Sequence, residues 1–329
     1  MSCQAACGLP SAIQWPVVAI LFSMKIPRSS SGKIVRTLLL GVAALIVLAG
    51  LAVLVAFTVA HTRLTRTYTL TVPSVVVRND AATVERGRHL ANTRGCTDCH
   101  GKDFAGAVVI NDSVVGHLSG PNLTRGKGGL PTNFGDLDYV RAIRHGVAGN
   151  GRPLLLMPSF EYSVLSDEDL GALIAFLKTL PAVDRPSGPV KPGPLMKVLI
   201  ALGEMKIDAA RIDHDAKRPV AVAAEATAEY GRYLSASCTG CHGTNLAGGK
   251  IPGAPPDWPL APNLTPAPGL FMAQASPADF MHVLRSRTLP DGHPLSPVMP
   301  AAFGQMTDLE LTALYKYIKS VPAVLSAKK

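Results

Sequence analysis

Aromatic residues and long blocks of charge are both scarce in this sequence. Phe, Trp and Tyr together make up 5% of the 329 residues, which does not favour cores built mainly from clusters of aromatic rings. Long charged blocks are absent and 47% of the residues are hydrophobic, so the composition is not that of a disordered chain. A chain of this length has room for about two folded domains.

The net charge of +9 does not indicate a surface for nucleic acid. Residues 1–80 contain seven Lys and Arg residues and one acidic residue, which gives +6. Residues 81–215 contain fifteen of each and are neutral, and residues 216–329 contribute the remaining +3. Most of the excess therefore flanks one hydrophobic segment, and we expect no nucleic-acid partner.

That hydrophobic segment, residues 37–60, has no charged side chain over 24 positions. A helix of this length would be about 36 Å long, enough to cross a lipid bilayer. Basic residues on its N-terminal side favour a cytoplasmic segment 1–36, a transmembrane anchor 37–60 and an exported remainder. A cleaved signal peptide is the alternative, but the apolar run is long for one and ends without a good cleavage site. We also hypothesise that translation begins at Met24, because the chain from there gives an ordinary basic leader to the anchor.

Four of the six cysteines lie in two copies of the pattern C-x-x-C-H, at residues 96–100 and 238–242. This is the signature of covalent c-type haem attachment: two thiols on one turn reach the porphyrin vinyl groups, and the next histidine binds the iron. A redox dithiol or half of a zinc site is the alternative for a lone C-x-x-C, but the histidine after both copies argues against it. The sequence therefore predicts two haem c groups. The predicted attachment residues are Cys96, Cys99, Cys238 and Cys241, and the predicted axial ligands are His100 and His242.

The two motifs belong to an internal repeat whose offset stays between 141 and 144 residues. A period this long indicates a duplicated domain. We place two domains at 83–185 and 225–329, a connector at 61–82, and a linker with a short helix at 186–224. Each copy is predicted to be mostly helical, with a long Gly/Pro-rich loop that has a haem to enclose. The terminal helices are predicted to open with capping boxes, Ser166-x-x-Asp169 and Thr307-x-x-Glu310.

The order of haem motif, Pro-Asn-Leu, late Met-Pro and capped terminal helix resembles class I cytochromes c. The resemblance covers each copy nearly end to end. It implies an all-α fold, with two tandem class I cytochrome c domains after one transmembrane helix. It also implies that Pro121 and Pro262 offer backbone carbonyls to the second nitrogen of the axial histidines, with ordinary turn positions as the alternative. Arg144 and Arg285 occupy equivalent positions in the two copies. Two interpretations stay open: the arginines are charge partners of haem propionates, or they lie on a solvated helix face.

Met157 and Met299 are the predicted distal iron ligands in this resemblance. Each lies 57 residues after its axial histidine, and each precedes a proline. Methionine ligation stabilises Fe(II) and raises the reduction potential relative to ligation by two histidines. The competing methionines of the second copy, which lack the matching position, are Met272, Met281 and Met306.

The predicted function is electron transfer by a dihaem cytochrome c, tethered to the bacterial cytoplasmic membrane and facing the periplasm. An iron with His and Met ligands has no open position, which suits a carrier more than an enzyme. The wider resemblance is to cytochrome c subunits that relay electrons from periplasmic dehydrogenases to a respiratory acceptor. We expect the lipid bilayer and redox proteins as partners: a dehydrogenase, an oxidase or a soluble cytochrome. The alternatives are a dihaem peroxidase-like enzyme and the dihaem subunit of a terminal oxidase of the cbb3 kind.

The paired motifs predict two covalently bound haems in each chain. Thioether bonds survive denaturation, so haem staining after denaturing electrophoresis should follow the polypeptide. The mass of the protein should exceed that of the apo-chain by two haems. Haem that extracts into acidified acetone, or a mass increase of one haem, would contradict this prediction.

Overall fold

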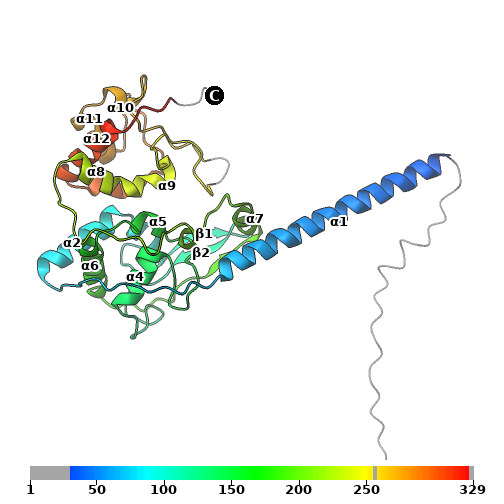
Figure 1. Cartoon of the computed structure of the whole chain (residues 1–329), viewed down its shortest axis with the longest axis horizontal. Coiled ribbons are helices and arrows are strands. Elements are labelled where there is room, and N and C mark those ends of the chain that lie inside the picture. The colour runs from blue at the N-terminus through cyan, green and yellow to red at the C-terminus, as the bar shows by residue number, and fades with distance from the viewer. Residues whose placement is uncertain (1–29, 255–257, 326–329) are drawn as a thin grey trace, which may run out of the picture. The chain divides into compact units, whose positions relative to one another are not determined.

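The computed structural model describes residues 30–254 and 258–325, so the hypothesis of a start at Met24 lies outside the described residues. The chain divides into two units, Met1–Val55 and Ala56–Lys329, and the second unit contains both C-x-x-C-H motifs (Figure 1). Helix α1 (Ser30–Thr65) includes the predicted anchor. Within the described residues it is the one helix long and apolar enough to cross a membrane.

Both repeat copies contain the same series of a first helix, a haem motif, a middle helix and a terminal helix (Figure 1). The elements of the first copy are α2 (Ala81–Thr93), α3 (Cys96–His100), β1 (Ala107–Asp112), β2 (Gly116–Gly120), α4 (Asp136–His145), α5 (Ser159–Tyr162) and α6 (Asp167–Lys178). Between the copies lie β3 (Val190–Pro192), α7 (Pro194–Leu202) and η2 (Asp208–Ala210). The elements of the second copy are α8 (Ala228–Leu234), η3 (Ser235–Cys238), α9 (Thr239–His242), α10 (Phe271–Gln274), α11 (Pro277–Ser286), η4 (Ala301–Gln305) and α12 (Asp308–Ser320).

The two terminal helices begin where their capping residues lie. At α12 the capping box is reciprocal: Thr307 Oγ1 accepts from the Glu310 backbone N–H at 3.2 Å, and Glu310 Oε2 accepts from the Thr307 N–H at 2.9 Å. At α6 the predicted box is half formed. Ser166 Oγ accepts from the Asp169 N–H at 3.1 Å, but the Asp169 carboxylate binds an arginine and a tyrosine on other helices. A charged partner outweighs the second half of the box.

The first and last helices of each copy cross at a glycine. A Cβ atom at Gly87 of α2 would lie 1.9 Å from the carbonyl oxygen of Ala172 in α6. A Cβ atom at Gly231 of α8 would lie 2.0 Å from the carbonyl oxygen of Ala313 in α12. Only glycine allows two backbones to approach this closely. Each crossing borders its own hydrophobic core, with fully buried Leu170 and Ile174 in the first and Tyr230, Leu234, Leu311 and Ile318 in the second.

The expectation of an all-α chain is not confirmed, because the first copy carries a small antiparallel sheet of strand order β1-β2-β3. β1 pairs with β2, with Ala107 opposite Gly120, and β2 pairs with β3 from the predicted linker. The Val-Val-Ile run at 108–110 has the β-branched side chains that favour a strand. The corresponding loop of the second copy, where described, forms only an isolated bridge between Gly249 and Ala261.

A third hydrophobic cluster joins the end of α1 to α7 within the second unit. Ala60 is fully buried in one cluster with Met196 and Ile200 of α7. Arg63 donates hydrogen bonds to the carbonyl oxygen of Ile200 and, at 3.3 Å, to that of Ala201. The short helix predicted in the linker therefore packs on the segment that leaves the anchor.

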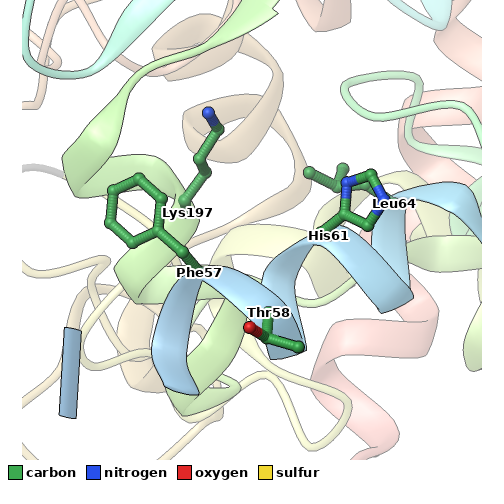
Figure 2. Close-up of a pocket in the computed structure, with 5 residues that line it drawn as sticks. All are labelled: Phe57, Thr58, His61, Leu64 and Lys197. Atoms are coloured by element: carbon green, nitrogen blue, oxygen red, sulfur yellow. The ribbon is translucent and has the colours of Figure 1, made fainter. Parts of the chain in front are cut away.

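A pocket opens beside this cluster, between the end of α1 and α7 (Figure 2). The Lys197 ammonium lies 5.4 Å from the centre of the Phe57 ring, which is a cation–π contact. Thr58, His61 and Leu64 complete the lining. None of these residues belongs to a C-x-x-C-H motif or a predicted distal ligand, so this pocket is not part of the candidate haem sites.

The glycine crossings predict an effect of Gly231→Ala opposite to that in an isolated helix. Alanine at an open helix position stabilises by about 1 kcal/mol relative to glycine. Here the added methyl group collides with backbone, so we expect the free energy of unfolding to fall by roughly 1–3 kcal/mol. Thermal denaturation of the haem-loaded protein measures this, with Arg232→Ala, exposed on the same helix, as the control. A melting temperature equal to or above that of the wild type would refute the close crossing.

Candidate functional site

The attachment motifs lie on short helical segments that bring both thiols of a motif onto one turn. α3 begins at Cys96, after Gly95 adopts the left-handed conformation with φ of 74°. In the second copy η3 ends at Cys238 and α9 carries the remainder of the motif. None of the four motif cysteines is paired in a disulfide, so each sulfur is available for a thioether bond. Two such cysteines on one turn, followed by a histidine, form the donor set of haem c attachment, so the residues fit the group.

Each motif histidine is oriented by a proline carbonyl. His100 Nδ1 donates to the Pro121 oxygen at 2.9 Å, and His242 Nδ1 donates to the Pro262 oxygen at 2.8 Å. This bond fixes the ring and leaves Nε2 as the free ligating atom. Burial lowers the pKa of both imidazoles, which favours the neutral form that binds metals. The contacts have the geometry that the resemblance implies, and ligation itself stays a prediction.

The loops that carry these prolines are anchored by asparagines, a role that the sequence analysis missed. The Asn122 side-chain amide donates to the carbonyl oxygens of Val183 and Arg185, both at 2.9 Å, after the end of α6. Asn263 donates in the same way to the Val324 carbonyl oxygen at 2.7 Å, after α12. The two asparagines occupy equivalent positions in the two copies of the repeat. This repetition is the sequence feature from which their anchoring role could have been predicted. They tie the carbonyl-bearing loop to the chain that follows the terminal helix.

The predicted distal methionines occupy equivalent loops in the two copies. In the first, Leu154 N–H donates to the Gly146 oxygen at 2.7 Å, and Met157 follows just before α5. In the second, Leu295 N–H donates to the Arg287 oxygen at 2.7 Å, and Met299 follows just before η4. Both methionines are half-buried. Two of the competing methionines instead lie in the hydrophobic core of the second copy, namely Met272 and Met306.

The equivalent arginines both bind an acidic residue at the start of a terminal helix. Arg144 is buried and donates to Asp167 Oδ1 at 2.7 Å and to the Leu165 carbonyl oxygen at 2.9 Å. Arg285 is exposed and binds Asp308. These contacts join the middle helix of each copy to its terminal helix. A role toward haem propionates stays a prediction.

A charged network connects the two copies, and the sequence analysis did not foresee it. Arg86 of α2 forms a bidentate pair with Asp169 of α6, at 3.0 and 3.2 Å. It also contacts Glu310 of α12 at 3.4 Å and the Tyr230 hydroxyl at 3.3 Å. From the second copy, the Tyr233 hydroxyl donates to Asp169 at 2.7 Å. We call the surface where these residues meet the interdomain seam.

Glu310 is the most strongly perturbed carboxylate of the seam. Burial opposes its ionisation, but the hydrogen bonds from His89 and the Thr307 backbone, with the charges of His89 and Arg86, lower the pKa of Glu310 to about 2. The His89 Nε2 to Glu310 Oε2 distance is 2.7 Å. Ionised Glu310 therefore stabilises the contact between the two copies.

Comparison with known protein families identifies both copies. Residues 228–322 match the family model described as cytochrome c, and residues 82–177 match that of cytochrome c oxidase, cbb3-type, subunit III. Together with the motif geometry, these matches define the chain as a protein with two cytochrome c domains, which carries two haem c groups. The chain is homologous to cytochrome c subunits of fructose, gluconate and alcohol dehydrogenases.

Three relatives illustrate this homology. The fructose dehydrogenase cytochrome subunit of Gluconobacter japonicus is 29% identical over 266 residues, covering 73% of this chain and 53% of that protein. The cytochrome c subunit of the quinone-dependent alcohol dehydrogenase of Gluconobacter oxydans is 26% identical over 281 residues, or 76% and 57%. The gluconate 2-dehydrogenase cytochrome c subunit of Pantoea cypripedii is 41% identical over 106 residues, or 30% and 23%. The chain spans about half the length of the first two relatives and less of the third.

The depressed pKa of Glu310 predicts how Glu310→Gln depends on pH. Because the folded-state pKa of about 2 lies below the ordinary value of 4.5, the stabilisation is complete above pH 4.5 and is lost as the pH falls toward 2. At pH 7 the variant should lose roughly 1–3 kcal/mol of unfolding free energy, the cost of weakening buried polar contacts. Thermal denaturation of holo-protein across this pH range measures the difference, with exposed Glu85→Gln as the control. A wild-type to variant difference that stays constant from pH 7 to pH 3 would contradict the assignment.

Proposed function

We propose that this protein is a membrane-anchored electron carrier that relays electrons from a periplasmic dehydrogenase to a respiratory acceptor. The observation that carries the proposal is the repetition of one complete site: a pair of cysteines on one turn, a histidine held by a proline carbonyl, and a Met-Pro loop. The homology to dehydrogenase cytochrome c subunits supports a dehydrogenase as donor. A soluble cytochrome or an oxidase is the proposed acceptor.

The proposed site roles follow the geometry of each copy. Haem c, when bound, supplies an iron that exchanges one electron between Fe(II) and Fe(III). The cysteines would hold the porphyrin by thioether bonds. The proline carbonyls fix the histidine rings and leave Nε2 as the atom that would bind the iron. The methionines would supply the second iron ligand and so exclude water and other ligands. The residues with these roles are Cys96, Cys99, His100, Pro121 and Met157 in the first domain and Cys238, Cys241, His242, Pro262 and Met299 in the second.

We further propose that each domain has the class I cytochrome c arrangement and lies on the periplasmic side of the inner membrane. The apolar, charge-free run within α1 supports an anchor at 37–60. The proposed domains are 83–185 and 225–329, after a connector at 61–82 and joined by a linker at 186–224. Basic residues before the run favour the cytoplasmic side for residues 1–36.

A second candidate function is that of a dihaem subunit in a terminal oxidase. The match of residues 82–177 to the cbb3-type oxidase subunit favours it. Purification from the native membrane in mild detergent separates the two proposals. Recovery with a dehydrogenase flavin or quinoprotein subunit supports the first, and recovery with a haem–copper subunit supports the second.

Replacing the predicted methionine ligands tests whether both sites are those of a carrier. Met157→Ala or Met299→Ala should remove the weak near-infrared Met-to-Fe(III) charge-transfer band of one haem, lower that haem's potential and open its iron to carbon monoxide. Near-infrared absorption and redox titration of the oxidised and reduced protein measure these effects.

Met306→Ala is the matched control for this experiment. Met306 lies in the core of the second domain, so its truncation should lower stability and leave the charge-transfer band intact. Carbon monoxide binding to one haem of the wild type would show an open iron, and the peroxidase-like alternative would then be favoured.

A further inference from the structure

One buried arginine connects the two haem-attachment segments. Arg94 lies two residues before Cys96 and is 6% exposed. Its Nη1 donates to the carbonyl oxygen of Leu234 at 3.0 Å and to the hydroxyl of Ser237 at 2.7 Å. Ser237 directly precedes Cys238. A single side chain therefore spans from the first attachment segment to the second.

The position of Arg94 is fixed from both domains. The Tyr162 hydroxyl donates to the Arg94 carbonyl oxygen at 2.8 Å, and the guanidinium carbon lies 5.8 Å from the centre of the Tyr233 ring. The Arg94 Nε atom is buried without a hydrogen-bond partner in the described part of the chain. Burying an incompletely paired cation opposes folding, so stability alone does not account for this residue.

A second contact brings the distal side of the first domain onto the second attachment motif. α5, which follows Met157, carries Glu161, and a Cβ atom at Gly240 would lie 2.0 Å from Glu161 Oε1. The equivalent of Gly240 in the first motif is Asp98, so the missing side chain is specific to the second copy. Burial and the nearby Asp208 carboxylate raise the pKa of Glu161 to about 8, against the lowering effect of the Arg94 and Arg211 charges.

We propose that Arg94 is a positioning residue for electron transfer between the two haem c groups, across the contact of Arg94 with Leu234 and Ser237. The inference rests on the proposed electron-carrier function. The step is a one-electron exchange: the iron of one domain passes from Fe(II) to Fe(III) while the other passes from Fe(III) to Fe(II), with no bond broken and no proton moved. Electron tunnelling falls steeply with separation, and bonded or hydrogen-bonded atoms carry it better than a gap. The two hydrogen bonds donated by Arg94 Nη1 hold the two attachment segments at a fixed separation and supply such a bonded path.

Flash reduction of the detergent-solubilised, fully loaded protein by a small photoreductant measures this step. Reduction by the reductant depends on its concentration, whereas redistribution of the electron between the haems does not. We expect Arg94→Gln to slow the concentration-independent phase by roughly tenfold, and to lower both haem potentials because a buried cation that favours Fe(II) is removed.

The Arg94→Lys variant distinguishes the effect of the Arg94 hydrogen bonds from the effect of its positive charge. Lysine keeps the cation, but its side chain ends one bond short of the Nη1 position and does not reach both acceptors. The potentials should therefore stay near those of the wild type while the concentration-independent phase slows. Ser237→Ala, a milder change, removes one of the two acceptors and should slow the same phase to a smaller extent. Arg88→Gln, at an exposed arginine of α2, the helix that ends just before Arg94, is the control and should change neither readout.

Three outcomes overturn the proposal while leaving the carrier function intact. If the concentration-independent phase of Arg94→Gln has the wild-type rate, the proposal is overturned directly. If that phase of Arg94→Lys has the wild-type rate, only the charge matters. An unchanged rate in Ser237→Ala, if the arginine variants fail to fold, overturns it as well. By contrast, carbon monoxide binding by the wild-type protein would overturn the carrier function itself.

Discussion

The close crossing of the first and last helices is the contact on which each haem domain depends. Gly87 and Gly231 let the paired backbones approach to a distance that no side chain would allow. Each domain is small, and a core of this size leaves little stability in reserve without its haem. Because the crossing holds the first and last helices of each copy together, the long loops between these helices enclose a single space. The asparagine bonds from Asn122 and Asn263 then hold the proline carbonyl loops against the chain beyond the terminal helix.

The two domains meet through a network of charged residues and through Tyr233, which packs against the hydrophobic clusters of both copies. Asp169 and Glu310, the acids near the start of the two terminal helices, both face Arg86. Hydrogen bonds from Tyr230 and Tyr233 complete the seam. Breaking a buried network of this kind leaves carboxylates without partners, which is costly, so the two domains are expected to keep one arrangement. A fixed arrangement gives the two haem sites one separation, which a relay of electrons requires.

Features set by local chemistry could be predicted from the sequence, and features set by contacts between distant segments could not. The C-x-x-C-H motifs, the duplication and the haem c cofactors were predicted because each depends on spacing along the chain. The Thr307 cap was also predicted, because capping is a local effect. The box at Ser166 formed only in part, because Asp169 has stronger partners that lie far away in sequence. The pairing of β3 with β2 and the hydrogen bond from Arg94 to Leu234 depend on tertiary contacts that no local pattern encodes.

The seam is asymmetric although the two domains arose by duplication, and this asymmetry selects which domains pair. Arg86 and Tyr230 are equivalent positions, and they face each other at 3.3 Å. Two first domains from separate chains would set Arg86 against Arg86, and two second domains would bring their Glu310 carboxylates together with no arginine between them. Asp98 would also fill the space that Gly240 leaves open for Glu161. The divergence of the copies thus disfavours pairing between like domains of neighbouring chains and favours the pairing of a first domain with a second domain.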